Sequence, residues 1–238
     1  MFYYLLSPLI TYNYLLIAAA ILPAVFLMVK VYRSDRLEQE SWQILWIMVR
    51  SGIFSALIAM VLERIFGSLL YATVHSRGLY EVLLYFVVVA VSEEGTKYLL
   101  LRKNSWQSDE FDCQFDGIVY AVFVSLGFAL WENISYVLHY GLSTAIIRAM
   151  TAIPGHTCFG VFMGLFYGVA KKFENRGDHE KSLRFRCMAV VIPVILHGTY
   201  DYIASMETGT WLFILFIAAL FFVSYRIVSR MSQVDHYI

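Results

Sequence analysis

The sequence predicts an all-α, polytopic membrane helix bundle, and three observations predict this fold class. Of the 238 residues, 60% are hydrophobic and 15% are charged, and the mean hydropathy is +0.65. A soluble domain of this length needs more polar surface than that composition supplies. Seven segments are apolar over the roughly 20 residues needed to cross a hydrocarbon core about 30 Å thick. Finally, Lys and Arg residues concentrate in alternate loops between these segments.

The predicted spans follow one another along the whole chain. They lie near residues 10–32, 43–62, 79–101, 116–139, 145–170, 187–205 and 210–228. No basic residue precedes the first, which therefore differs from a secretory signal peptide. The fifth is the least regular, because Pro154 disfavours helix at the residue before it. We expect a short initial segment there, followed by a helix from about 155 to 170.

The polar connectors, chiefly 102–115 and 171–186, carry no repeat or linker, so we expect a single integral membrane domain over residues 1–238. Thirteen basic residues fall on one side of the seven-span arrangement and three (Arg64, Arg77 and Arg148) on the other. This bias predicts an outside N-terminus and a cytoplasmic C-terminus. The thirteen are Lys30, Arg33, Arg36, Arg102, Lys103, Lys171, Lys172, Arg176, Lys181, Arg184, Arg186, Arg226 and Arg230.

Composition also excludes some classes of function. The formal net charge is zero, which argues against a nucleic-acid partner. Cys113, Cys158 and Cys187 are scattered and form no CxxC pair, so they indicate neither a disulfide framework nor a thiolate zinc site.

Ionisable residues inside the third span are the first candidates for a functional site, because burying a charge in a bilayer is costly. Glu93 and Lys97 are four residues apart, so they share a helix face and can pair. Lys97 could instead extend toward the cytoplasmic face. Glu94 lies about 100° around the helix from Glu93. A structural ion pair with a spare glutamate is the alternative to a functional role.

The next three spans carry comparable residues. Glu132 and Asn133 lie in the second half of the fourth span, with Tyr136 one turn beyond Glu132, whereas Asp116 at its start is interpreted as a helix cap. In the sixth span, Asp201 is four residues after His197 and can orient its imidazole ring. The fifth span repeats small residues on the His156 face, which favours close helix packing. These are Gly160, Gly164 and Gly168.

Four consecutive spans therefore carry an acid, a histidine or both, whereas the other three carry charges only near their ends. A rise of about 1.5 Å per residue puts these groups in the middle to outer part of the bilayer. We therefore expect them to share a polar cavity. A glutamate beside a histidine can take a proton from water, and a second histidine with an amide or acid can stabilise an oxyanion. Hydrolysis is thus the expected chemistry.

Metal chemistry is the alternative. His156, His197 and Glu132 on different helices are the residue types of a catalytic zinc site with an open position. The HExxH signature is absent, so zinc is allowed but not required, and a mechanism without a cofactor is favoured.

The stretches SEEGTKY, FDGIVYA, GFALWENISY, PGHTCFGVFMG and HGTYD, in this order over about residues 90–205, resemble the PrsW family. These bacterial intramembrane proteases are related to the type II CAAX-prenyl proteases. The resemblance implies catalytic roles for Glu93, Glu94, His156 and His197, with Glu132 as the acid of the fourth span. Asp201 stands where CAAX-type relatives tend to have asparagine, and Lys97 replaces a later arginine, so the PrsW branch is favoured.

The resemblance also implies a catalytic core over about residues 79–205, in a multi-pass protein of the cell membrane. Its implied substrate is a single-span membrane protein, typically an anti-sigma factor, first cut near its extracytoplasmic side. Lys97, Glu132, Asn133 and Asp201 are expected to support the catalytic groups. A proton-coupled transporter and a non-catalytic scaffold of the same fold remain the alternatives.

Overall fold

The computed structural model describes the backbone of residues 2–238 and the side chains of residues 14–238. This part of the chain is helical with short connections and contains no strand, so the all-α prediction is confirmed. In chain order the elements are α1 (Phe2–Tyr32), α2 (Trp42–Thr73), α3 (Arg77–Leu83), the π-helix η1 (Leu84–Val89), α4 (Ala90–Ser105), α5 (Asp116–Tyr140), α6 (Leu142–Met150), α7 (Ala152–Asn175), α8 (His179–Ala204) and α9 (Thr210–Gln233).

Six of the predicted spans correspond to helices that are long and apolar enough to cross a membrane: α1, α2, α5, α6 with α7, α8 and α9. The remaining one, predicted over 79–101, is the continuous helical run α3–η1–α4. It has the length of a span but carries the charged residues of the third predicted segment. The expected multi-pass bundle is therefore confirmed.

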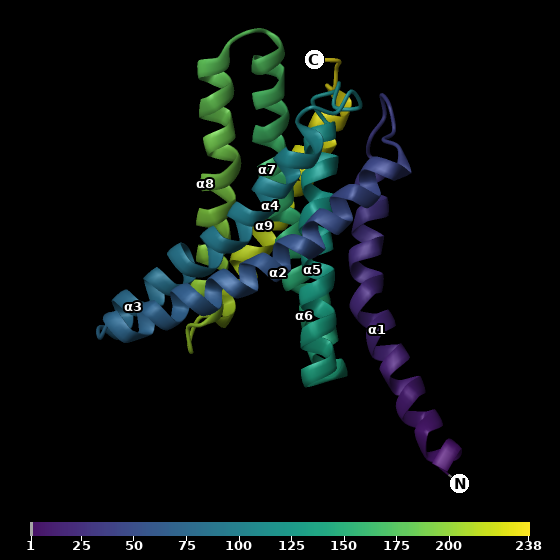
Figure 1. Ribbon diagram of the computed structural model, residues 1–238, viewed down its shortest axis with the longest axis vertical. Coiled ribbons are helices and arrows are strands. Elements are labelled where there is room, and N and C mark those ends of the chain that lie inside the picture. The colour runs from purple at the N-terminus through teal and green to yellow at the C-terminus, as the bar shows by residue number, and fades with distance from the viewer. Residues whose placement is uncertain (1) are drawn as a thin grey trace.

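The loops divide between the two ends of the bundle as the basic residues predict. Figure 1 shows the α1–α2, α4–α5 and α7–α8 connections at the end that holds the C-terminus, and the N-terminus at the opposite end. The α5–α6 and α8–α9 connections lie at the N-terminal end. Hence the basic loops share one side, and the assignment of that side to the cytoplasm stays a prediction.

Two predicted boundaries were wrong. Helix α2 continues to Thr73 instead of ending near residue 62, and Figure 1 shows it inclined to α5, α7 and α8. The predicted 171–186 connector is reduced to three residues between α7 and α8. Gly177 adopts a positive φ of 77° after α7, and the Asp178 side chain caps α8 by accepting from the Lys181 N–H. The flanking Lys, Glu and Arg residues are good helix formers and extend both helices.

The break in the fifth span also differs from the expectation. It falls at Thr151 (φ −124°, ψ −69°) between α6 and α7, and α7 already includes Ile153 and Pro154. Proline is tolerated in the first turn of a helix because its missing N–H has no intrahelical partner there. Pro154 therefore lies inside the start of α7 and does not delay it to residue 155.

Helix α5 lies at the centre of the bundle, and its residues from Asp116 to Ala129 are all buried. Glycines of α7 allow α7 to approach it closely, as the sequence predicted. A Cβ added to Gly160 would lie 3.0 Å from the Val122 Cα, and one added to Gly164 would lie 2.8 Å from the Gly117 carbonyl carbon. This contact fixes α7 against α5 and so positions His156 one turn before Gly160.

We expect Gly164→Ala to destabilise the protein by about 1–3 kcal/mol, because the new methyl group would overlap backbone atoms of α5. In the matched variant Gly67→Ala of α2, the new methyl group has no heavy atom within 4 Å, so the stability of the protein should be unchanged or slightly increased. Thermal unfolding of both variants in one detergent checks this, and equal melting temperatures would contradict the packing described here.

Candidate active site

Side chains from six helices (α2, α4, α5, α6, α7 and α8) and from η1 surround one cavity of about 300 Å³. The predicted residues Glu93, Glu132, His156, His197 and Asp201 all line it. Their convergence is the shared polar cavity that the sequence predicted. The other lining residues are Glu63, Tyr85, Val89, Tyr136, Arg148, Ala152, Phe159 and Tyr200.

Lys97 joins the two glutamates of α4. Its Nζ donates to Glu94 Oε1 at 2.7 Å and to Glu93 Oε2 at 3.2 Å, and it lies 3.9 Å from the centre of the Phe128 ring. The Lys97 and Glu94 side chains are completely buried, so Lys97 does not extend to the membrane surface. The predicted pairing with Glu93 is present, and the contact with Glu94 is shorter. The π-helix η1 immediately precedes this segment, as π-helical turns often do at functional sites.

The same ammonium group also reaches His156. The Lys97 Nζ is 3.2 Å from His156 Nδ1, and His156 Nε2 is 3.0 Å from Glu132 Oε2. An ammonium can only donate hydrogen bonds, so Nδ1 accepts and Nε2 carries the proton that is donated to Glu132. The hydrogen-bond network thus assigns the tautomer of His156.

His197 is held from two sides. Its Nδ1 lies 2.9 Å from Glu94 Oε1, to which it donates, and its Nε2 lies 3.5 Å from Asp201 Oδ2. The expected proximity of Asp201 to the ring is therefore present. Phe159 stacks on the ring at 4.8 Å between centroids. Because Glu94 accepts at Nδ1, the Nε2 edge of His197 is the one directed toward Asp201 and the cavity.

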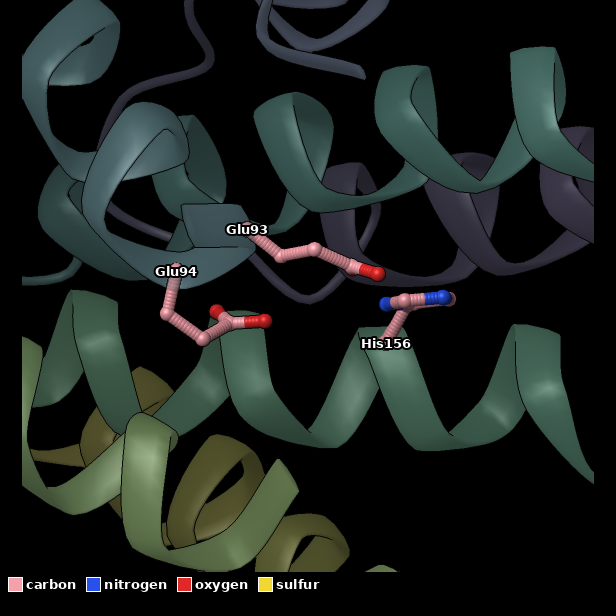
Figure 2. Close-up of side chains that lie close together, drawn as sticks. All are labelled: Glu93, Glu94 and His156. Carbon is pink, nitrogen blue, oxygen red and sulfur yellow. The ribbon is translucent and has the colours of Figure 1, made fainter. Parts of the chain in front are cut away.

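Figure 2 shows Glu93 and Glu94 reaching from α4 toward His156 on α7. One ligand atom from each of these three buried residues lies within 4.8 Å of the others. The predicted metal set of His156, His197 and Glu132 is not among the convergent groups in the described part of the chain. The structure thus brings both glutamates of α4 near His156 Nδ1, whereas Glu132 contacts the other ring nitrogen, Nε2.

Asn133 lies beside the cavity and is not among its lining residues. Its Nδ2 donates to the Ala20 carbonyl of α1 at 2.8 Å, and its Oδ1 accepts from Arg148 Nε at 3.0 Å. Arg148 in turn donates to Glu132 Oε2 at 2.8 Å. Asn133 therefore supports the site indirectly, by holding the arginine that contacts Glu132.

Sequence reasoning missed Glu63, Arg148 and Tyr200 as cavity residues. The expectation that the other three spans hold charges only near their ends is wrong for α2, because Glu63 lies well inside it. For Glu63, the signal available in the sequence was an acidic residue directly after a long apolar segment. Arg148 was counted only as a loop charge, although it lies on α6 and follows Ile146 and Ile147.

Residues 40–227 match a family described as "PrsW family intramembrane metalloprotease". The chain belongs to this family. Among its curated relatives, Protease PrsW of Geobacillus kaustophilus is 32% identical over 216 residues, covering 90% of this chain and 91% of the relative. Protease PrsW of Halalkalibacterium halodurans is 31% identical over 227 residues, covering 92% and 98%.

Protease PrsW of Clostridioides difficile is 33% identical over 202 residues, covering 83% of this chain and 82% of the relative. No solved structure matches the chain. The predicted membership of the PrsW family and the prediction of an intramembrane protease are both confirmed. The description of the family as metalloproteases adds a metal that the sequence reasoning did not favour.

The side chains around Lys97 have the chemistry that such a metal needs. Two carboxylates and an imidazole are zinc-ligand types, and Oε2 of the buried Glu94 accepts no hydrogen bond. Glu93, Glu94 and His156 therefore fit a metal ion. The Lys97 Nζ contacts all three donors in this structure, so the ammonium would have to withdraw for an ion to be held there.

Proposed function

We propose that this PrsW-family protease hydrolyses a peptide bond of a single-span membrane protein, of the anti-sigma-factor type, in the cavity between α4, α5, α7 and α8. The observation that carries the proposal is the convergence of Glu93, His156 and His197 on that cavity. A polar cavity bounded by a carboxylate and two oriented imidazoles is suited to activating water against a carbonyl.

Glu93 is the group that takes the proton of the attacking water. Its carboxylate lines the cavity, whereas Glu94 is completely buried and is not a lining residue. Glu94 is instead engaged by Lys97 and His197, which makes it the residue that orients His197. The sequence left the two glutamates interchangeable, and this difference in access to the cavity supports different roles for them.

His197, with both ring nitrogens protonated, stabilises the oxyanion through its Nε2–H and gives that proton to the leaving amine. The proton that Glu93 took from water then restores the His197 ring. Glu94 fixes Nδ1 as a donor, so Nε2 is the atom available on the cavity side. Asp201 lies beside that nitrogen and helps to keep the ring in its catalytic orientation. Arg148 and Tyr200 line the same space and add hydrogen-bond donors near the substrate carbonyl.

A metal ion, when bound by Glu93, Glu94 and His156, would supply Lewis acidity and a more acidic water. In either case the same side chains exclude bulk water and hold the reacting atoms. The role of Glu132 is to fix His156 through Nε2, with help from Arg148.

The position of the cavity supports cleavage near the extracytoplasmic side of the membrane. Asp201 lies three residues before the end of α8, and Arg148 two residues before the end of α6. Both lie toward the end of the bundle that holds the N-terminus, which the distribution of basic residues assigns to the outside. A substrate cut there would lose its extracytoplasmic portion.

Substrate trapping tests this proposal. The Glu93→Gln variant, expressed with a crosslinkable tag, should retain single-span membrane proteins with an anti-sigma-factor type cytoplasmic domain, and purified wild-type enzyme should cleave them. Wild-type enzyme that leaves every trapped protein intact would contradict the proposed activity. Cleaved proteins of another class would contradict the proposed substrate and leave the proteolytic activity standing.

A further inference from the structure

A second group of buried carboxylates lies far from the catalytic cavity, where the α1–α2 loop meets the start of α5. Asp35, Glu40 and Asp116 each offer an oxygen within 4.8 Å of the others. Their side chains are buried, with residue exposures of 4%, 7% and 2%. Figure 1 shows the α1–α2 loop at the end of the bundle that holds the C-terminus, opposite the α5–α6 connection beside the cavity.

Asp35 is unusual because neither of its carboxylate oxygens accepts a hydrogen bond, although both are buried. Another unpartnered oxygen belongs to Asp235 of the C-terminal tail, whose other oxygen accepts from the Phe115 N–H at 2.9 Å. None of the ion pairs in the described part of the chain includes Asp35, Glu40 or Asp116. Several acidic groups are therefore buried together without a compensating cation.

The remaining oxygens of the group are partly used. Asp116 Oδ2 accepts from the N–H groups of Asp112 and Cys113, at 3.1 and 2.6 Å, so Asp116 is not the helix cap that the sequence indicated. The Tyr120 hydroxyl is 2.6 Å from Glu40 Oε2 and donates to it. Asp116 Oδ1 and Glu40 Oε1 lie outside these hydrogen bonds. Together with Asp35, they leave an oxygen-rich site that forms no ion pair with a cationic side chain of the described residues.

The burial of these acids raises the pKa of both loop residues, Asp35 and Glu40. Burial raises the pKa of Glu40 to about 7. Burial and the nearby charge of Asp235 raise the pKa of Asp35 to about 6, although the backbone N–H groups of Leu37 and Glu38 lower it. These N–H groups attract the carboxylate without reaching hydrogen-bond geometry. A bound cation would relieve this unfavourable burial of negative charge.

We propose that Asp35, Glu40 and Asp116 bind a hard divalent cation, Mg²⁺ or Ca²⁺, which ties the α1–α2 loop to the start of α5. Carboxylate oxygens without sulfur or nitrogen donors are the ligands that these ions prefer, and water completes their coordination. The site is structural, because it shares no residue with the catalytic cavity. The ion would hold α1 and α2 against the central helix that carries Glu132.

Thermal unfolding of the full-length protein in detergent, after removal of metals with a chelator, tests the proposal. A saturating amount of MgCl₂ or CaCl₂ should raise the melting temperature by roughly 5–10 °C over KCl at the same ionic strength. Asp35→Asn should abolish this rise. Without cation, the same variant should melt at or above the wild-type temperature, because it removes an unpaired buried charge.

Three further variants make the result specific. Glu40→Gln should also abolish the rise, which keeps the test valid if Asp35→Asn does not fold. Glu38→Gln changes an exposed acid of the same loop and should keep the full rise. Glu94→Gln should keep it too, because the active site is elsewhere. The proposal is overturned if neither salt stabilises the wild type beyond KCl, or if Asp35→Asn and Glu40→Gln respond as the wild type does.

Discussion

Glu93→Gln is expected to lower the rate of substrate cleavage by a factor of about 10²–10⁴, the usual contribution of a general base. Glutamine has nearly the same shape but cannot take a proton from water. Lys97 would keep its shorter contact with Glu94, so the fold should change little. Single-turnover cleavage in detergent measures the rate, and the melting temperature of the same preparation reports on the fold.

Glu63→Gln is the matched control, because Glu63 is another carboxylate of the same cavity and has no hydrogen bond or ion pair with the catalytic network. It should retain most of the wild-type rate. Loss of activity in Glu63→Gln with full activity in Glu93→Gln would show that the base has been assigned to the wrong helix.

Lys97→Met is expected to have the largest effect on stability, about 3–5 kcal/mol, which corresponds to a fall of roughly 6–20 °C in melting temperature. Methionine fills similar space but removes the positive charge between Glu93 and Glu94. Both carboxylates would then be buried without the ammonium that now contacts them at 3.2 and 2.7 Å. Thermal unfolding of wild type and variant under identical conditions, in the presence of a chelator, measures the difference.

The double variant Lys97→Met/Glu94→Gln identifies the cause of that loss. Removing the more deeply buried carboxylate should restore more than half of the lost stability, because fewer charges remain unpaired. If the double variant is less stable than Lys97→Met, the lysine acts through packing against Phe128 and not through its charge.

Local spacing predicted those parts of the site that lie on one helix. The four-residue separations of Glu93 from Lys97 and of His197 from Asp201 place each pair on one face, and both pairs are in contact. The concentration of acids and histidines in four consecutive spans also predicted their convergence. Helical periodicity is sufficient for inferences of this kind, because it is set by the backbone alone.

The spacing of residues within one helix does not predict which side chains of different helices are in contact. The Lys97–His156 contact joins residues 59 positions apart and depends on how α4 and α7 are rotated about their axes. Glu63 was missed because the hydropathy of α2 falls at the Glu63–Arg64 pair, although the helix continues. Asn133 was expected to support the catalytic groups, but its contacts with α1 and Arg148 could not be predicted. Rotation and tilt of helices are set by packing, which a single sequence does not specify.

Cleavage of a purified single-span substrate in proteoliposomes, with the cut mapped by mass spectrometry, tests the central claim most directly. Wild-type enzyme is predicted to cut one or a few peptide bonds in the extracytoplasmic half of the substrate's membrane span, and Glu93→Gln to leave the substrate intact. Cleavage by Glu93→Gln at the wild-type rate would contradict the assignment of Glu93, and a cut in the cytoplasmic half would contradict the proposed side of cleavage.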